Sequence, residues 1–319
     1  MLSVATLGSW PLWVGFLAFV AVMLALDLGV FHRRAHAISL REAAVWSAVW
    51  IGLAAVFAFG VFHLFGPQRG LEFTTGYLIE KALSVDNIFV MVVLFGAFGV
   101  PAHQQHRVLF WGILGALVMR AIFILAGTAL IARFHWTIYL FGVFLVFTGV
   151  RMLLSRGEHG HPENNVMVRL ARRVLPVAPG QDTDHFLARV DGRWMVTTLF
   201  LALVAVEFTD LIFAVDSIPA VLAVSQDPFI VFTSNIFAIL GLRSLYFVLA
   251  GVVHKFRYLK LGLALVLVFV GVKMAIVDIF KIPVGVSLAV VGLLITGSIL
   301  SSLVADGRRR MLEERTATS

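Results

Sequence analysis

Two stretches of sequence decide the fold, EKALSVDNI at Glu80–Ile88 and DLIFAVDSI at Asp210–Ile218. Each has an acidic residue, five intervening positions, an aspartate after Val, a small amide or hydroxyl residue and Ile. Both lie inside long apolar segments. Four further stretches repeat in the same order: GILGALVMRAIFILAG (112–127) with NIFAILGLRSLYFVLAG (235–251), and FTGVRM (147–152) with FVGVKM (269–274). The chain therefore carries an internal repeat.

The composition is that of a membrane protein. Of the 319 residues, 60% are hydrophobic and 13% are charged, against roughly 45–50% and about 25% in soluble domains. The mean hydropathy of +0.97 comes with few amphipathic segments, so most apolar side chains must face something other than one small core. We therefore expect lipid to be the solvent and the main partner of this fold.

Several classes of function are excluded at the same level. The chain has no cysteine, which excludes a disulfide scaffold, a thiolate zinc site and cysteine nucleophilic catalysis. The net charge of +7 would suggest nucleic acid in a soluble chain, but here the basic residues mark one membrane face, so no nucleic-acid partner is expected. The sequence shows no phosphate loop, dinucleotide fingerprint or nucleophilic triad. We expect neither an enzyme nor a resident cofactor.

Apolar segments near 20 residues predict an all-α, polytopic protein with about nine transmembrane helices, because that length crosses a hydrocarbon layer of about 30 Å. The predicted spans are Trp10–Val30, Ala43–Phe65, Phe73–Val100, Val108–Ala132, Trp136–Leu154, Met195–Val224, Phe229–Val253, Leu259–Phe280 and Pro283–Val304. With nine spans, 18 of the 25 Lys and Arg fall on one side of the membrane. The positive-inside rule then places the N-terminus outside and the C-terminus in the cytoplasm.

The repeat divides this single transmembrane domain, residues 1–319. Residues 76–154 form repeat 1, residues 155–194 a cytoplasmic connector and residues 195–276 repeat 2. Because each repeat has three spans (3–5 and 6–8), the second copy enters from the opposite side, which gives an inverted repeat. In the connector, VMVRLARRVL (166–175) predicts either an interfacial helix on anionic lipid or a solvated helix.

Five acidic residues fall inside predicted spans 3 and 6: Glu80, Asp86, Glu207, Asp210 and Asp216. An acid at mid-bilayer costs about 2.5–3.5 kcal/mol, so these side chains must face one another, cations or water. One interpretation is structural, since Lys81, Arg120 and Arg243 could neutralise three carboxylates. The other is an ion site, because acids inside a membrane mark ion pathways.

Helix geometry constrains the ion site. A spacing of six residues leaves Glu80 and Asp86 some 120° apart on an ideal helix, with about 9 Å of rise between them. Either spans 3 and 6 are broken between their acids, or each carboxylate meets a partner from the other repeat. Glu207 and Asp210, three residues apart, share a face and could hold a cation together.

The available donors are oxygens. Asn87 and Ser217 follow the two aspartates and are candidate auxiliary ligands, with Asn235 a further donor. Carboxylate, amide and hydroxyl oxygens suit Mn²⁺, Mg²⁺ or Ca²⁺ better than Zn²⁺ or Cu⁺. Closely spaced acids also share protons, which makes exchange of the cation with H⁺ a natural hypothesis.

The sequence resembles the TerC family of bacterial membrane proteins, and within it the Alx branch. The resemblance covers nearly the whole chain. It is carried by GYLIEKALSVDNIFV (76–90), AVEFTDLIFAVDSIPAVLAV (205–224), DPFIVFTSNIFAILGLRSLYF (227–247) and LVFVGVKM (267–274). The resemblance implies a protein of the bacterial cytoplasmic membrane and Mn²⁺ export. It also implies that the five acids are the intramembrane carboxylates that transport requires. The family is named for tellurium resistance, but this chain has no cysteine or cofactor motif for tellurite reduction.

These observations give one main hypothesis and two alternatives. The main hypothesis is a divalent metal transporter that exports Mn²⁺ through a midplane site of Glu80, Asp86, Asn87, Glu207, Asp210, Asp216 and Ser217. Arg120 and Arg243 would then hold the repeats in register. The alternatives are a Ca²⁺/H⁺ exchanger and a non-transporting scaffold that supports secreted proteins. The order of metal selectivity, the coupling ion and the oligomeric state are left open.

Overall fold

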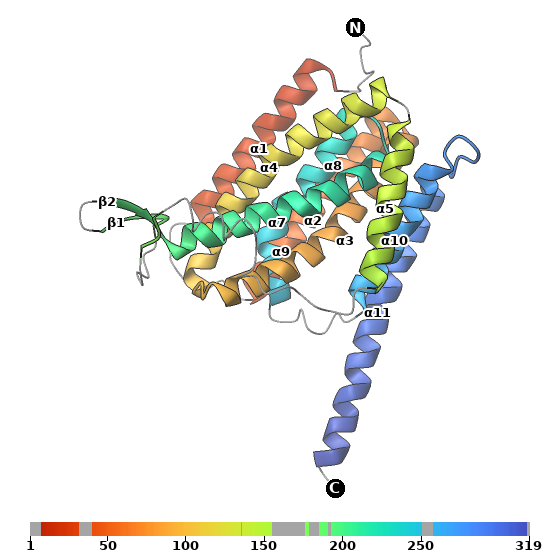
Figure 1. Ribbon diagram of the computed structural model, residues 1–319. Helices are drawn as coiled ribbons and strands as arrows, with labels where there is room; N and C mark the ends of the chain where they lie inside the picture. The colour runs from red at the N-terminus through yellow and green to blue at the C-terminus, as the bar shows by residue number, and fades with distance from the viewer. Residues whose placement is uncertain are drawn as a thin grey trace.

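The computed structural model describes residues 8–31, 40–134, 136–154, 176–178, 185–190, 193–250 and 258–317; within these ranges the side chains of residues 27–31, 86, 89, 97 and 306–317 are not described. The helices are α1 (Trp10–Phe31), α2 (Leu40–Phe65), α3 (Pro67–Ala97), α4 (Ala102–Arg133), α5 (Thr137–Leu154), α7 (Thr198–Leu222), α8 (Pro228–Leu240), α9 (Leu242–Ala250), α10 (Leu259–Ala275) and α11 (Val284–Ala317). The protein is thus a polytopic all-α membrane protein, as predicted (Figure 1).

Each predicted span coincides with helical structure, but several ends differ: α3 and α4 each begin six residues before the predicted start, and α11 extends to Ala317, 13 residues beyond the predicted end. By length and apolar composition, five of the described helices can cross a membrane, or six if the bent pair α8–α9 is one span. The number nine remains a prediction. The predicted start of span 6 was also wrong: Met195 belongs to a β-strand, and α7 begins at Thr198, where the Thr197 side chain accepts a hydrogen bond from the Phe200 amide.

Helix α3 occupies the centre of the bundle, in contact with α2, α7, α8, α9, α10 and α11. Its interior location explains why so polar a helix is stable in this protein. The helix runs without interruption past Glu80 and Asp86, and α7 likewise continues through Pro219 to Leu222. The first of the two geometric options, a break between the acids of spans 3 and 6, is therefore not observed.

The break lies instead in the seventh predicted span. Helices α8 and α9 meet at Gly241 with a bend of 42°. The bend frees the carbonyl of Ala238, which a continuous helix would pair with the amide of Leu242. Lys81 Nζ of α3 donates to this carbonyl at 3.2 Å. A side chain from α3 thus replaces a hydrogen bond of the helix ladder, one of the recognised causes of a sharp kink.

Helices α5 and α10 pack backbone to backbone, and α11 lies beside them along one edge of the molecule (Figure 1). A Cβ placed on Gly271 would lie 2.7 Å from the Gly142 carbonyl oxygen and 2.8 Å from the Val146 nitrogen. A Cβ on Gly149 would lie 2.8 Å from the Ala264 oxygen and 3.0 Å from the Val268 nitrogen. We call this contact the glycine seam.

The contacts of the glycine seam are equivalent when the two sequence repeats are aligned. The match of FTGVRM with FVGVKM aligns Gly149 with Gly271, and the same offset aligns Gly142 with Ala264 and Val146 with Val268. Each glycine therefore contacts the aligned backbone atoms of the opposite helix. Two elements related by a twofold axis would make such a pair of contacts.

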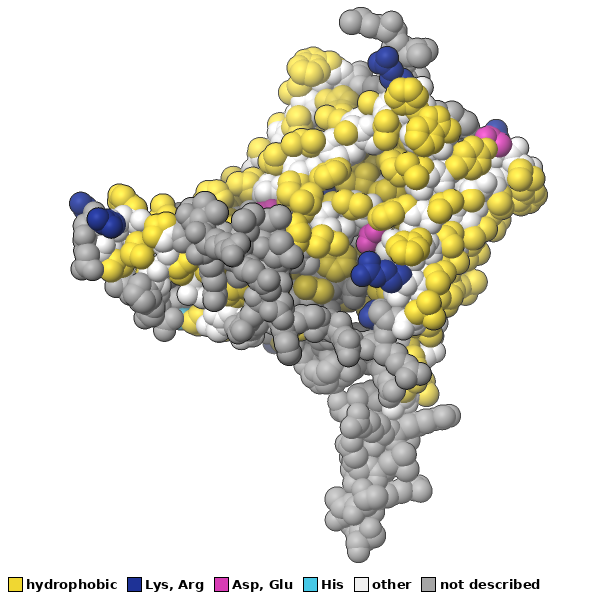
Figure 2. Space-filling view, in the orientation of Figure 1, with side chains coloured by type: hydrophobic (Ala, Val, Ile, Leu, Met, Phe, Trp, Pro, Cys, Tyr) yellow, Lys and Arg dark blue, Asp and Glu magenta, His cyan; other side chains and the backbone are white. Residues whose placement is uncertain are grey.

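The surface is apolar where a soluble protein would be polar. Figure 2 shows hydrophobic side chains over most of the described surface, with charged groups at a few places. Large apolar residues such as Leu64 (75% exposed) and Leu293 (74%) face outward. Lipid contact explains this distribution, because such surfaces carry no cost in hydrocarbon.

Part of the connector forms a small antiparallel hairpin, β1 (Leu187–Val190) with β2 (Arg193–Val196), which projects from the bundle at the start of α7 (Figure 1). The sequence analysis predicts no β-strand in this part of the connector. The predicted helix at 166–175 lies outside the described residues.

Candidate functional site

The site begins where α3, α7 and α8 approach one another closely. A Cβ on Gly76 of α3 would lie 2.9 Å from Ser234 Oγ of α8 and 3.1 Å from Val221 of α7. Glycine is therefore needed for this approach. Glu80 lies one turn further along α3 and points into the same interior, where its side chain is 1% exposed.

Arg120 of α4 joins the acids of the two repeats. One guanidinium nitrogen, Nη1, is ion-paired with Glu80 Oε1, and the other, Nη2, lies 3.1 Å from Asp210 Oδ1. Arg120 is 2% exposed and Asp210 is 3% exposed. Asp210 thus meets a partner from the other repeat, as the second geometric option requires, whereas this contact of Glu80 is with an arginine of its own repeat.

Amide and hydroxyl groups complete this group of side chains. Asn87 Nδ2 donates to Asp210 Oδ1 at 2.7 Å, and Asn235 Nδ2 of α8 donates to Glu80 Oε2 at 3.1 Å. Arg120 Nη1 also lies 3.4 Å from Ser217 Oγ and 3.3 Å from Asn235 Oδ1. We call the set Glu80, Asn87, Arg120, Asp210, Ser217 and Asn235 the central cluster.

One oxygen of the central cluster is unused. Asn87 Oδ1 is buried and accepts no hydrogen bond from the described residues. Asn87 itself is 1% exposed, and its amide nitrogen is already held by Asp210. A buried polar atom without a partner costs about 1–3 kcal/mol, and this one belongs to an amide that already contacts the Asp210 carboxylate.

Glu207 lies beside the central cluster. It is half-buried and lies three residues before Asp210 on α7, a spacing that makes the two side chains neighbours on the helix surface. Its carboxylate packs against the backbone of α4 at Gly115, where any Cβ would overlap it. The prediction that Glu207 and Asp210 share a face is consistent with this arrangement.

Asp216 lies apart from the central cluster. Its Oδ1 accepts a hydrogen bond from Thr148 of α5 at 3.3 Å, and it lines a cavity of about 250 Å³ together with Arg151 and Lys260. The sequence grouped Asp216 with Asp210 because both lie on one helix. A six-residue spacing, however, turns the two carboxylates toward different neighbours.

The side chain of Asp86 lies outside the described residues; the backbone at this position is part of α3. Of the seven predicted site residues, the structure therefore brings together four: Glu80, Asn87, Asp210 and Ser217. Among the residues that are described, no group of three or more Asp, Glu or His side chains is placed to hold a metal ion. A cation at the central cluster would need amide and hydroxyl ligands besides its two carboxylates.

One buried acid was missed by the sequence analysis. Glu72, near the start of α3, accepts from Arg69 Nη1 at 2.8 Å, from Gln68 at 3.1 Å and from Ser225 Oγ at 2.6 Å. It is 7% exposed. Its two local partners were visible in QRGLE as i,i+3 and i,i+4 neighbours, but the contact with Ser225 joins distant parts of the chain.

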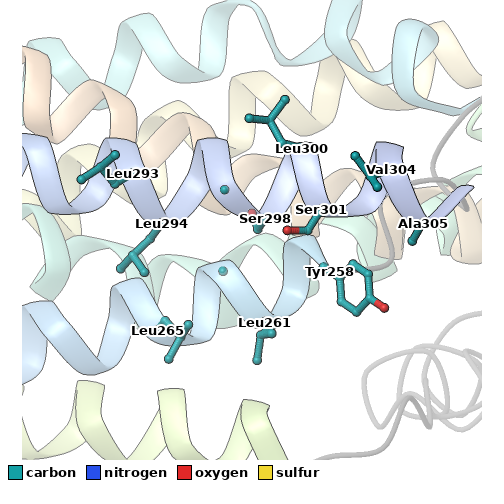
Figure 3. Close-up of a pocket in the computed structure, with 12 residues that line it drawn as sticks. Tyr258, Leu261, Leu265, Leu293, Leu294, Ser298, Leu300, Ser301, Val304 and Ala305 are labelled. Carbon is teal, nitrogen blue, oxygen red and sulfur yellow. The ribbon is translucent and has the colours of Figure 1, made fainter. Parts of the chain in front are cut away.

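A large groove between α10 and α11 has a different chemistry. Figure 3 shows side chains of α10 and α11 around a space of about 960 Å³, mostly leucines with Ser298, Ser301 and Tyr258. No described residue that lines it is charged. It lies on the apolar exterior and has no ligand set for a cation.

The fold and its buried charged centre define an integral membrane protein with a polar interior. The sequence profile of the TerC family, described as integral membrane proteins, matches residues 65–310. The chain belongs to the TerC family.

Similar proteins occur in several bacteria. The chain is 60% identical to an uncharacterised membrane protein of Myxococcus xanthus over 299 residues, which are 94% of each chain. It is 48% identical to the candidate membrane-bound redox modulator Alx of Escherichia coli K12 over 309 residues, 94% of this chain and 96% of Alx. An uncharacterised membrane protein of Rickettsia felis is 39% identical over 301 residues, 94% of this chain and 99% of that protein. No solved structure matches.

Proposed function

We propose that the protein exports a divalent metal ion, with Mn²⁺ as the substrate, across the bacterial cytoplasmic membrane. The observation that carries the proposal is the meeting of Glu80 and Asp210 in the interior of an apolar bundle. Aligned acids of two repeats that converge at one buried point are typical of transporter ion sites.

The ligand chemistry supports a hard cation. Glu80, Asp210, Ser217 and the unused oxygen of Asn87 offer carboxylate, hydroxyl and amide oxygens within one group of contacts. Mn²⁺, Mg²⁺ and Ca²⁺ prefer such donors. Asp86, Glu207 and Asp216 stay in the proposal as further acids along the route of the ion, and exchange with H⁺ remains part of it.

Transport into sealed vesicles tests the proposal. Inside-out vesicles that contain the protein should accumulate Mn²⁺, and Glu80→Gln and Asp210→Asn should each abolish the accumulation. Asp278→Asn is the matched control, because Asp278 lies outside the central cluster and pairs with Tyr139. Unchanged flux in both site variants would refute the site, and stronger competition by Ca²⁺ than by Mg²⁺ would point to a Ca²⁺/H⁺ exchanger.

A second function is favoured by one specific observation. Arg120 already neutralises part of the buried negative charge, as it would in a non-transporting scaffold whose acids hold the helices together. Thermal unfolding separates the two functions. A transporter should be protected by Mn²⁺, by about 2.7 kcal/mol at 100 times the Kd, whereas a scaffold should show no metal-dependent protection.

A further inference from the structure

Arg120 uses the oxygens that a cation at the central cluster would need. Its nitrogens contact Glu80, Asp210, Ser217 and the Asn235 oxygen, at distances up to 3.5 Å. We propose that Arg120 is a built-in competitor of the transported divalent cation, which binds when the guanidinium leaves Glu80 and Asp210. This inference rests on the proposed function and adds the residue that sets the affinity of the site.

The charges favour exchange over simultaneous occupancy. Within the central cluster, two carboxylates and one guanidinium carry a formal charge of −1. A divalent cation added beside Arg120 would make the cluster +1 and set two cations next to each other, with Glu207 as the neighbouring acid outside the cluster. Replacement of the guanidinium by the divalent cation gives zero. In a buried site of low dielectric, the neutral arrangement has the lowest desolvation cost, and the like charges of guanidinium and metal are kept apart.

Arginine must leave by moving, because it keeps its proton at every physiological pH. A lysine in the same position could instead become neutral in place. Exchange at this site is therefore a side-chain movement coupled to cation binding, with no proton released by Arg120.

Glu207 offers the displaced guanidinium a second partner. Its carboxylate touches α4 at Gly115, which on an ideal helix lies about 7.5 Å from Arg120 along the axis and about 140° around it, so only the long arginine side chain can cover the gap. Glu207 also lies three residues before Asp210 on α7, on the same side of that helix, and Arg120 contacts Asp210. Arg120 can thus pass from Asp210 to an acid on the neighbouring turn of α7 without becoming an isolated buried charge.

Calorimetric titration of the full-length protein in nanodiscs with MnCl₂ tests the competition. Arg120→Gln should bind Mn²⁺ about tenfold more tightly than the wild type, within the roughly 5–150-fold range usual for coupled ligands. Arg133→Gln, at the end of the same helix, is the control and should bind as the wild type does. Equal or weaker binding by Arg120→Gln, with wild-type binding intact, would overturn the inference and leave the proposed function standing.

Absence of Mn²⁺ binding in both the wild type and Arg120→Gln would instead refute the proposed function together with this inference. If Arg120→Gln does not fold, Arg120→Lys carries the test, because lysine cannot make the forked contact with both acids. That variant should also bind Mn²⁺ more tightly, and unchanged or weaker binding contradicts the competition.

A double-mutant cycle tests the role of Glu207. Glu207→Gln should weaken Mn²⁺ binding in the wild-type background, where Arg120 loses its second partner. In the Arg120→Gln background the same substitution should have little effect. An equal loss in both backgrounds would show that Glu207 does not act through Arg120.

Discussion

The glycine seam and the central cluster use the two sequence repeats differently. In the glycine seam, Gly149 and Gly271 occupy aligned positions and touch aligned backbone atoms, so both repeats contribute equally. In the central cluster, the acids Glu80 and Asp210 are also aligned, but the cation described between them, Arg120, comes from the first repeat. Both repeats contribute equally to the helix packing, whereas the arginine of the central cluster comes from the first repeat.

The helices that carry the two aligned arginines differ in the same way. Helix α4 is continuous through Arg120, while its counterpart is broken into α8 and α9 just before Arg243. The repeat alignment places Val118 opposite Gly241, the residue at the bend. A valine in the continuous helix thus stands where the bent pair has glycine. Helices that pack symmetrically can therefore surround a charged centre that is not symmetric.

The largest effect is expected at the central cluster. Arg120→Met leaves two buried carboxylates without their cation and should lower the free energy of unfolding by about 3–5 kcal/mol. Denaturant titration in detergent micelles measures this loss. Addition of Glu80→Gln and Asp210→Asn to the same chain should recover most of it, and a triple variant as unstable as Arg120→Met would contradict the charge argument.

The glycine seam should respond less strongly, and symmetrically. Gly271→Val places a branched side chain against the Gly142 backbone and should cost about 3 kcal/mol of unfolding free energy, the upper part of the overpacking range. Gly149→Val should cost a similar amount, since its surroundings are equivalent. Gly52→Val is the control, because a Cβ there meets nothing within 4 Å. Clearly unequal losses of unfolding free energy at the two seam positions would contradict the equivalence of their surroundings.

The bend at Gly241 should show an intermediate effect. Lys81→Met removes the donor to the Ala238 carbonyl and should destabilise the protein by about 2 kcal/mol, as for other unsatisfied buried groups. Lys81→Arg keeps a donor and should be close to the wild type in thermal unfolding. If both variants unfold alike, the lysine contact does not stabilise the bend.

The smallest effect is expected at Asp216. Thr148→Val removes one hydroxyl donor to its carboxylate, at 3.3 Å, and should cost about 1 kcal/mol or less. Thermal unfolding in detergent is sufficient to detect the change, with Thr74→Val, whose hydroxyl bonds the backbone of its own helix, as the control. A loss as large as that of Arg120→Met would mean that Asp216 belongs to the central cluster after all.

The location of the helices was predictable from the length of apolar runs, because lipid imposes that length on every span. The break at Gly241 was not, since glycine is common in continuous membrane helices and the lysine that satisfies the freed carbonyl comes from α3. The strands at Leu187–Val196 were also missed, in a connector whose prolines and glycines suggested a loop.

The sequence predicted the type of site, a buried group of acids with partners, but only some of the residues that form it. The cost of acids in lipid required partners for Glu80 and Asp210, and Arg120 was among the candidates. Which acids meet depends on helix rotation and tilt, which residue spacing alone does not fix. Asp216 therefore lies with Thr148, and Asn235 enters from α8. Glu72 was not predicted as a buried acid because it lies near the start of a helix, where charged residues are common.

Glu80 and Lys81 are consecutive residues, and their side chains contact different parts of the molecule: Glu80 pairs with the Arg120 guanidinium, and Lys81 donates to the Ala238 carbonyl at the α8–α9 bend. A peptide bond is a rigid plane, so these two anchors are mechanically joined. Any rotation of this turn of α3 that frees the carboxylate also pulls on the lysine. In the proposed transporter, binding of the ion at Glu80 and bending of α8–α9 at Gly241 would therefore be coupled.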